Sequence, residues 1–325
     1  MRIGLWAATL MVLVGLSSPS LGAPPNWPSS LTIATASPGG VYLIYGRGLA
    51  SILSEALGVP VSAQATQGPD QNVLLLESGE AQLGFVTMGV ALQAWNSTGE
   101  WTHGKQLRKL RALFPMYDTP FQFVVLSDSS IKSLADMSNK RIGSGPQGGT
   151  AGTYLPLVFK ALNIPVTLRY GAYEIMETQL QSHLLDALGA AIGAPTPFIS
   201  KLDEAHQIEF VTPTNEEIAK LREAMPELGV SVIPAGTYRS LKSEYTTIGL
   251  FNFAVASKDL PADLVYEIVK AFYAGHDRMV KTHPSANESV VANLKRNEFL
   301  PYHPGAVRYY RENGINLPAA LSAAE

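Results

Sequence analysis

The sequence contains no cysteine among its 325 residues. A chain without cysteine forms no disulfide, performs no thiolate chemistry and carries no lipid on an N-terminal cysteine. A chain of this length buries enough surface to fold without disulfides, so the lack of cysteine is compatible with secretion. It excludes a disulfide-stapled scaffold.

Charge is also sparse. Charged residues make up 16% of the chain, hydrophobic residues make up 46%, and the formal net charge is -3. This balance is typical of a globular protein with a sizeable core and excludes a disordered chain. Lys and Arg form no cluster, so the sequence predicts no nucleic-acid partner. The length allows one large domain or two ordinary ones.

Catalytic motifs are missing as well. The sequence has no HExxH, GxSxG or GxxxxGK[ST] pattern, and its six histidines form no metal-ligand cluster. His276 and His283 lie seven positions apart, but the Asn, Pro and Ser residues near His283 argue against one continuous helix. His303 is interpreted as a turn residue, and Glu216 and Glu217 as the acidic first turn of a helix. We therefore predict no catalytic residue, no metal site, no cofactor and no enzyme activity.

Only one long hydrophobic run is present, over residues 3–16 after Arg2, and small residues follow it up to Ala23. This order is that of a secretory signal peptide. The alternative is a membrane anchor, but the run has 14 residues and a bilayer span needs ~20. We predict that residues 1–23 are a cleaved signal peptide and that the mature protein is periplasmic.

Strand and helix patterns alternate twice along the chain. Residues 31–34, 60–63 and 83–86 are predicted strands, and the helices between them stop at Gly58 and Gly79. A second series starts at residue 141. Residues 59–61 precede their counterparts at 164–166 by 105 positions, and residues 82–84 precede those at 187–189 by the same offset. The repeat predicts two α/β lobes, each with a mostly parallel sheet flanked by helices.

Two extended segments are predicted to link the lobes, at residues 110–126 and 248–255, and a long amphipathic helix is predicted at 264–279. The first lobe then comprises residues 24–125 and 250–325, and the second lobe, 126–249, is inserted into it. Two crossing segments make a hinge, which suits closure of the lobes on a ligand.

Two glycine-rich loops occupy matched positions, at residues 37–40 and 144–149. Each joins the carboxyl end of a strand to the start of a helix, where ligands of open α/β sheets bind. Glycine lets the backbone approach a ligand closely, and a helix N-terminus favours a carboxylate or a phosphate. Two such loops facing one hinge cleft predict a binding site for a small anion.

Residues beside the loops are suited to recognising a small polar molecule. The candidate ligand-binding residues are Gly39, Gly40, Val41, Tyr42, Tyr45, Gln71, Asn72, Thr87, Met88, Ser144, Gln147, Gly149, Thr150 and Pro195. The alternative for the two tyrosines is packing between the lobes. Arg47 and Arg169 could each pair with a ligand carboxylate or be surface arginines, and for Arg47 the surface reading is favoured.

Several motifs resemble the TAXI-type solute-binding proteins of TRAP transporters. Residues 33–42 (IATASPGGVY) resemble the family's opening motif, and residues 79–86 (GEAQLGFV) resemble its "GEADLAFV" strand. Residues 131–143, 233–238 and 303–306 resemble its later motifs. The resemblance extends from about residue 31 to about residue 317.

The resemblance implies a two-lobed, type II-like periplasmic binding protein that serves a membrane permease. That TRAP permease has fused small and large subunits and uses an ion gradient without ATP. Family ligands are small carboxylates, glutamate-like ones among them. The residues that carry over as ligand-binding positions are those of the 39–42 loop, the start of the helix at Gln71 and Asn72, and the 144–150 loop. We expect a monomer.

Two positions depart from the family pattern. Residues 87–89 (TMG) replace a polar "QSD"-like triplet, and residues 42–45 (YLIY) replace a "YYPLG" form. Both changes make the wall of the first lobe less polar, so a less polar organic acid is as plausible a ligand as glutamate. A ligand sensor for a signalling receptor and an enzyme on the same fold remain alternatives.

Overall fold

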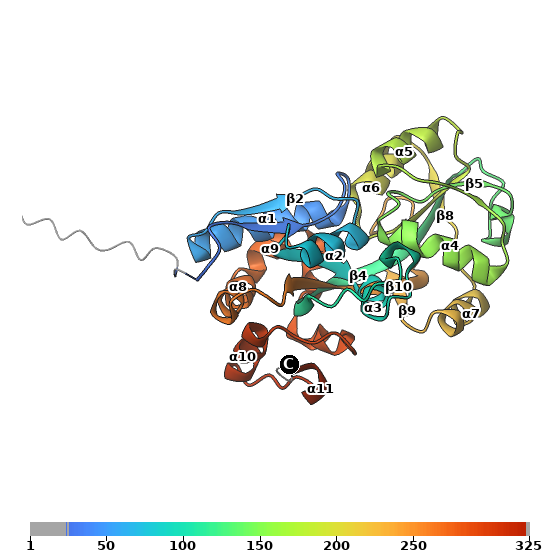
Figure 1. Ribbon diagram of the computed structural model, residues 1–325. Coiled ribbons are helices and arrows are strands. Elements are labelled where there is room, and N and C mark those ends of the chain that lie inside the picture. The colour runs from blue at the N-terminus through green and yellow to red at the C-terminus, as the bar shows by residue number, and fades with distance from the viewer. Residues whose placement is uncertain (1–23, 25, 323–325) are drawn as a thin grey trace, which may run out of the picture.

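The computed structural model describes residues 24 and 26–322, and the predicted signal peptide lies outside the described residues. Two lobes lie side by side and are joined by strands that pass through the middle of the molecule (Figure 1). The predicted two-lobed α/β fold is confirmed.

The first lobe repeats the strand–helix order that the sequence predicts. Its elements are β1 (Leu31–Ala34), α1 (Val41–Leu57), β2 (Val61–Gln64), α2 (Pro69–Ser78), β3 (Leu83–Thr87), α3 (Met88–Asn96) and η1 (Glu100–Thr102). β1 pairs in parallel with both β2 and β3. Helix α1 ends because Gly58 adopts φ 64°, a left-handed conformation that glycine takes without steric cost.

The second lobe has the same arrangement, followed by additional elements. It contains η2 (Ala135–Met137), β5 (Arg141–Gly143), α4 (Thr150–Leu162), β6 (Thr167–Arg169), α5 (Tyr173–Gln181), β7 (Ala187–Ala191), α6 (Pro197–Ala205), β8 (Ile208–Phe210), α7 (Asn215–Ala224) and β9 (Gly229–Ile233). β5 pairs in parallel with β6 and β7, as β1 does with β2 and β3. The internal repeat is therefore a repeat of sheet topology.

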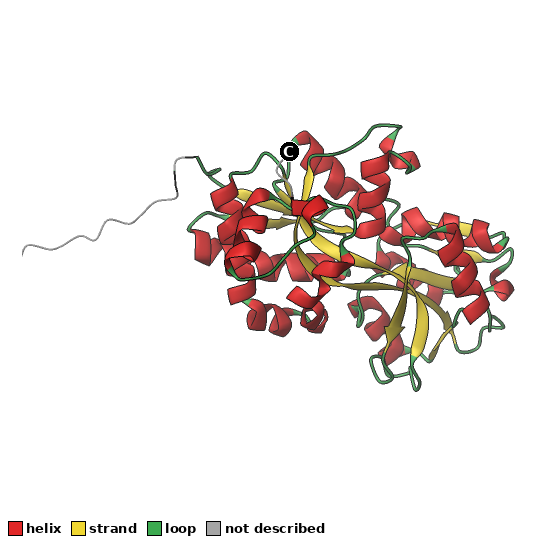
Figure 2. Ribbon diagram, turned by 90° about the horizontal axis from the view of Figure 1, so that it is seen from below, coloured by secondary structure: helices red, strands yellow, loops and turns green. Residues whose placement is uncertain are grey.

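Two strands, β4 (Leu110–Leu126) and β10 (Tyr245–Ser257), connect the lobes. The sheet order is β2-β1-β3-β10-β4-β7-β5-β6, and β8 and β9 pair with β4 and β10. β10 and β4 are antiparallel neighbours, and their paired ribbon is visible from below as the continuous strands between the lobes (Figure 2). Because each strand runs unbroken through both lobes, the boundaries at residues 126 and 249 stay a prediction.

The C-terminal part packs on the first lobe. It comprises α8 (Ala262–Ala274), α9 (His276–Thr282), η3 (Pro284–Glu288), η4 (Val291–Arg296), α10 (Pro304–Glu312) and α11 (Ala319–Ser322). Phe272 of α8 stacks on Phe114 of β4, with ring centroids 3.7 Å apart. The single helix predicted over 264–279 is wrong: Gly275 caps α8 and starts α9. The strand that the repeat predicts from residue 164, as the counterpart of the one near residue 60, begins at Thr167 instead.

Candidate ligand-binding cleft

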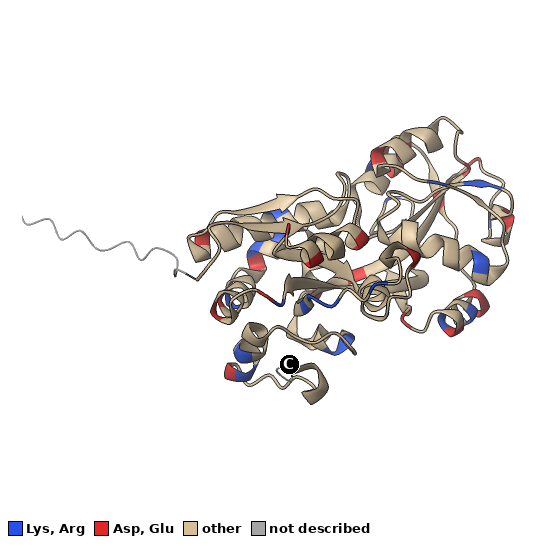
Figure 3. Ribbon diagram, viewed as in Figure 1, with Lys and Arg blue, Asp and Glu red and all other residues tan. Residues whose placement is uncertain are grey.

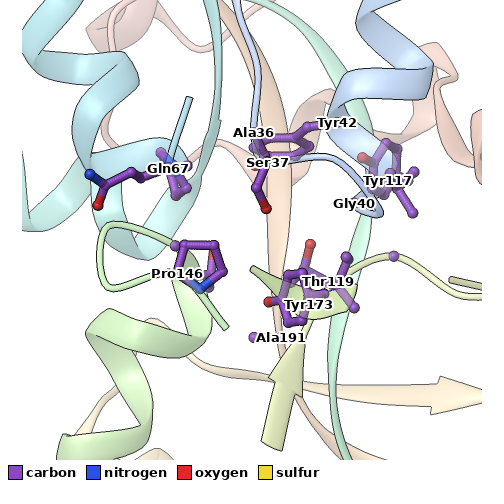
Figure 4. A pocket seen from close by; sticks show the side chains of 17 residues that line it. Ala36, Ser37, Gly40, Tyr42, Gln67, Tyr117, Thr119, Pro146, Tyr173 and Ala191 are labelled. Carbon is purple, nitrogen blue, oxygen red and sulfur yellow. The ribbon is translucent and has the colours of Figure 1, made fainter. Parts of the chain in front are cut away.

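A cavity lies between the lobes, where both glycine-rich loops meet the crossing strand β4 (Figure 4). Its lining residues are Ala36, Ser37, Gly40, Val41, Tyr42, Gln67, Gly68, Pro69, Tyr117, Thr119, Pro146, Gly149, Thr150, Tyr173, Ala191, Ile192 and Gly193. None of these residues is charged. The centre of a water molecule can occupy 40 Å³ there, enough for a few waters at roughly 10–15 Å³ each. The lobes are thus closed on each other.

Four helices begin at this cavity. Helix α1 follows Gly40, α2 follows Gly68, α4 follows Gly149, and α5 starts at Tyr173. None of the four has a side-chain cap hydrogen bond at its N-cap residue. The first N–H groups of a helix have no partner within it, and the N-terminus carries a partial positive charge. In α2 the first residue is proline, which has no N–H, and the Asp70 N–H donates to the carbonyl oxygen of Gly148. The starts of α1, α4 and α5 therefore make the cavity favourable for an anion, although no cationic side chain lines it.

Gly68 shows how closely the lobes approach each other. It has φ 141°, and a Cβ atom added to it would lie 2.7 Å from the carbonyl oxygen of Gly148 in the second lobe. A contact that short with backbone cannot be relieved by turning a side chain. Glycine at position 68 is thus required both by the backbone conformation and by the closed arrangement.

The wall on the side of the first lobe is held by hydrogen bonds to the crossing strands. Tyr42 donates its hydroxyl hydrogen to Asn252 Oδ1 at 2.6 Å. Asn252 Nδ2 donates to the carbonyl oxygen of Tyr117 and to Thr119 Oγ1, both at 2.6 Å. Burial raises the pKa of Tyr42 and of Tyr117 well above the usual value, so both phenols are neutral.

The wall on the side of the second lobe is held by ring stacking and by hydrogen bonds to β4. Tyr173 stacks on Phe198 of α6, with ring centroids 4.6 Å apart and planes at 10°. Gln122 of β4 donates from Nε2 to the carbonyl oxygen of Ile192 and accepts a hydrogen bond from Tyr238 at 2.7 Å. These contacts fix the backbone of residues 191–193, which lines the cavity.

Two hydroxyl groups that line the cavity lack partners. Ser37 Oγ and the Tyr117 hydroxyl are buried and have no hydrogen bond among the described residues. Ser37 points into the space between Pro146 and Tyr173 (Figure 4). A buried polar group without a partner costs stability, so such groups call for an explanation. Binding of a polar solute here would satisfy both.

Five of the candidate residues line this cavity: Gly40, Val41, Tyr42, Gly149 and Thr150. The other nine lie outside its lining.

Four of these nine lie at or near the contact between the lobes. Gly39 faces Glu174 and Tyr173. Thr87 Oγ1 lies 3.4 Å from Thr150 Oγ1, and Met88 lines a separate surface pocket with Arg222 and Phe251. The carbonyl oxygen of Pro195 lies 3.1 Å from His283 Nε2.

The remaining five candidate residues contact other parts of the protein or solvent and do not line the cavity. Tyr45 is buried in the core with its hydroxyl 2.8 Å from Ser289 Oγ, and Asn72 is buried and donates to the carbonyl oxygens of Thr35 and Phe85. Gln71 accepts a hydrogen bond from the Gln67 backbone. Ser144 is buried without a partner among the described residues, and Gln147 is exposed.

Ser37 belongs to the predicted 37–40 loop but is not among the candidate residues. Several other lining residues escaped sequence reasoning: Gln67, Tyr117, Thr119, Tyr173 and Ile192. Tyr117 and Thr119 lie two positions apart on an extended segment, so they share one face of β4. That spacing was the available signal, but it does not say which face meets the cleft.

The arginine and histidine candidates lie outside the cavity. Arg47 and Arg169 are exposed and do not line it. In the view of Figure 3, Lys and Arg are scattered over both lobes. His303 Nδ1 accepts a hydrogen bond from the N–H of Gly305 at the start of α10.

Within residues 24–322, leaving out residue 25, no group of three potential metal ligands occurs. Glu217 forms a capping box with Thr214 at the start of α7, as its interpretation as an acidic first turn predicts.

No helix in the described part of the chain combines the length and apolarity needed to cross a bilayer. The profile of the NMT1-like family matches residues 33–314, most of the chain.

Solved structures with the same fold include the periplasmic binding protein BugD, at 13% identity and TM-score 0.53, covering 89% of this chain and 99% of BugD. A structure described as a periplasmic transporter matches at 14% identity and TM-score 0.52, covering 80% of this chain and 87% of that one. A Xanthomonas citri protein bound to a chloride ion matches at 12% identity and TM-score 0.50, with 88% and 96% covered. The fold is therefore that of two-lobed periplasmic binding proteins.

Proposed function

The chain belongs to the NMT1-like family, and on that premise we propose that it is an extracytoplasmic solute receptor that captures a small organic anion by lobe closure. One observation carries the proposal. Helix N-termini from both lobes, those of α1, α4 and α5, meet without a side-chain cap at a cavity whose lining includes no charged side chain. The backbone N–H groups would bind a carboxylate, and the hydroxyls of Ser37 and Tyr117 would bind a second oxygen.

The lining also narrows the ligand class. An amino acid carries an ammonium group, which needs a carboxylate or several acceptors when it is buried. No Asp or Glu lines this cavity, and Val41, Pro69, Pro146, Ala191 and Ile192 give it an apolar floor. A short monocarboxylate with a hydroxyl or keto group therefore fits better than glutamate, in line with the less polar wall that residues 42–45 and 87–89 predict.

Contacts from both lobes supply the driving force for closure. A solute shifts the equilibrium between open and closed forms only as far as it binds the closed form more tightly. Groups from α1 and α2 on one side and from α4 and α5 on the other can meet the same small anion only when the lobes are closed. The finer proposal is delivery of the anion to an ion-driven TRAP permease in the periplasm, which the motifs at residues 33–42 and 79–86 support.

The test is thermal unfolding of the mature protein with acetate, lactate, pyruvate, succinate, 2-oxoglutarate, glutamate and leucine. A ligand at 100 times its Kd stabilises the folded state by about 2.7 kcal/mol, which raises Tm by several degrees. We expect lactate or pyruvate to raise Tm most and leucine to have no effect. If no carboxylate changes Tm, and native mass spectrometry of the purified protein detects no bound anion, the proposed function is wrong.

Transport and sensing differ in the membrane partner. A gene for a fused permease next to the gene for this chain favours transport, whereas a gene for a receptor kinase there favours sensing. Uptake of the identified anion into vesicles that contain the permease should require this protein and an ion gradient. Conversion of the bound anion to a product would instead support an enzyme on the same fold.

A further inference from the structure

A cluster of hydrogen bonds joins the lobes beside the cavity, between the start of α2 and the first turn of α4. The backbone N–H of Asp70 donates to the carbonyl oxygen of Gly148 at 3.3 Å. Thr153 Oγ1 lies 3.1 and 3.0 Å from the two carboxyl oxygens of Asp70. Asp70 is 6% exposed. We call Asp70, Thr153 and the carbonyl of Gly149 the latch.

If Asp70 is ionised, the latch contains more hydrogen-bond acceptors than hydrogen atoms to donate. Thr153 Oγ1 also lies 3.1 Å from the carbonyl oxygen of Gly149. A hydroxyl has one hydrogen to donate, while a carboxylate and a carbonyl only accept. An ionised Asp70 would thus compete with Gly149 for a single hydrogen. A protonated Asp70 donates to Thr153, and Thr153 donates to Gly149, so each of the two hydrogens has an acceptor and no charge is left without a partner.

In the described part of the chain, no Lys, Arg or His forms an ion pair with the Asp70 carboxyl group. Helix α3 and the loop 144–149 contain no charged residue, and the only charged residue of α4, Lys160, lies in its last turn. The other acid of α2, Glu77, accepts a hydrogen bond from the Lys109 backbone. The adjacent Tyr154 is a neutral phenol bonded to Glu227.

Burial raises the pKa of Asp70 to about 8, and the hydrogen bond from Thr153 acts in the opposite direction. The positive ends of α2 and α4 also favour the ionised form, but their effect is smaller than that of burying an unpaired carboxylate.

We propose that Asp70 enters the closed state as a neutral carboxylic acid, so that capture of the anion takes up one proton from solution. This inference rests on the proposed function, because it concerns the closure that capture requires. In the open form α2 and α4 separate, water reaches the Asp70 carboxyl, and it ionises with an ordinary pKa. Asp70 is then a positioning residue: it joins the lobes and need not touch the anion.

The sign of the pH dependence follows from linkage. The closed form binds the proton more tightly than the open form, so closure is favoured at low pH and weakened as pH rises toward 8. Between the pKa of Asp70 in the open form and its pKa in the closed form, the association constant of the anion falls by up to about tenfold per pH unit. On the far side of the cleft, His283 contacts Pro195, and burial lowers the pKa of His283, so it acts in the opposite direction below about pH 7.

The experiment is calorimetric titration at pH 7.5, where histidine is largely neutral, with lactate or pyruvate, whichever binds more tightly. It is done in two buffers with different ionisation enthalpies, because the difference in heat counts the protons taken up. We expect between one half and one proton per bound anion. Heats of binding that are identical in the two buffers would overturn this inference and leave the proposed function intact. If no carboxylate of the panel gives any heat of binding, the proposed function itself fails.

Two variants separate a proton effect from a structural one. Asp70→Asn keeps a neutral donor next to Thr153 and should bind at pH 7.5 at least as tightly as wild type, with no proton uptake. The control Asp128→Asn removes an exposed carboxyl group of the second lobe and should take up protons like wild type. Proton uptake that persists in Asp70→Asn would assign the proton to another group and contradict the inference.

A second measurement needs no ligand and no change at the latch. Because the chain has no cysteine, Ser62→Cys and Thr178→Cys place one spin label on an exposed position of each lobe. The distance between the labels should shift toward the closed value as pH falls from 8.5 to 6.5. A distance distribution that does not change over this range would also contradict the inference.

Discussion

The two walls of the cleft come from the same strand–loop–helix unit, but they hold their polar groups differently. On the first wall, Tyr42 and Asn252 form a chain of short hydrogen bonds to the crossing strands. Behind the second wall, the hydroxyls of Ser144 and Thr196 are buried without partners among the described residues, ring stacking holds Tyr173, and Gln122 of β4 donates to Ile192. Equivalent places in a structural repeat thus carry different chemistry: a chain of hydrogen bonds through Asn252 of β10 holds the first wall, whereas the second combines ring stacking with the hydrogen bonds of Gln122.

The largest expected difference between the walls concerns the buried amides on the crossing strands. Asn252→Leu removes hydrogen bonds to three residues, whereas Gln122→Leu removes bonds to two. Since each buried group left unsatisfied costs about 1–3 kcal/mol, we expect losses in free energy of unfolding of about 4 and about 2 kcal/mol. Urea unfolding measures both, and an equal or larger loss for Gln122→Leu would contradict the contrast between the walls.

A side chain larger than glycine, inserted between the walls, should weaken anion binding more than it lowers the free energy of unfolding. A Cβ atom at Gly89 of α3 would lie 2.2 Å from the hydroxyl oxygen of the buried Tyr154 in the second lobe. Gly89→Ala therefore opposes closure by about 1–3 kcal/mol, which weakens anion binding about 5- to 150-fold. The free energy of unfolding without anion should fall less than the free energy of binding, because the open form relieves the clash with Tyr154, and the remaining contact of 2.8 Å is with the end of the Leu250 side chain.

The control for Gly89→Ala is the double variant Gly89→Ala/Tyr154→Phe, which removes the clashing oxygen and should recover part of the affinity. Calorimetry checks both variants. Unchanged affinity in Gly89→Ala would show that binding does not require the closed arrangement.

Two tyrosines of the first wall form a matched pair of smaller effect. Tyr42→Phe leaves Asn252 Oδ1 without its donor and should cost about 1–2 kcal/mol of stability. Tyr117→Phe removes a hydroxyl that has no partner among the described residues, so stability should be unchanged. If that hydroxyl binds the solute, affinity falls about tenfold, or about 1.4 kcal/mol. Unchanged affinity would remove Tyr117 from the proposed site.

The smallest expected effect compares the two glycine-rich loops directly. Ser37 and Ser144 both follow the first strand of their lobe, and both hydroxyls are buried without a partner among the described residues. Only Ser37 lines the cavity. Ser37→Ala should therefore weaken anion binding by about 0.5–1.5 kcal/mol, while Ser144→Ala leaves affinity unchanged. Equal losses in the two variants would mean that both loops bind the solute.

The fold was largely predictable because glycine and periodicity act locally. Gly58 and Gly79 end helices wherever the remaining chain goes, and the 105-residue offset identified the repeat before any contact was known. The long segment at residues 110–126 is one strand, as its alternation indicates. The break at Gly275 was missed because apolar spacing continues across it.

The cleft was less predictable because the type of a residue does not say which way its side chain points. Tyr42 and Tyr45 lie three positions apart on α1, but only Tyr42 reaches the cavity, and Tyr45 packs in the core. Asn72 looks like a ligand-binding amide but satisfies two backbone carbonyls within its own lobe. Tyr117 and Thr119 enter the site from a strand that contacts both lobes, a long-range fact that local pattern does not contain.

The position of β10 in the sheet has a consequence for synthesis and export. β10 lies between β3 and β4, yet it follows every element of the second lobe in the chain. The chain is made from its N-terminus. The crossing strand β4 and the second-lobe strands β5 to β8 are therefore all present before β10 is made. Until then one edge of β3 and one edge of β4 have unpaired backbone groups, and such edges promote aggregation. The first lobe begins first and is completed last, so these two edges stay unpaired until β10 has been made.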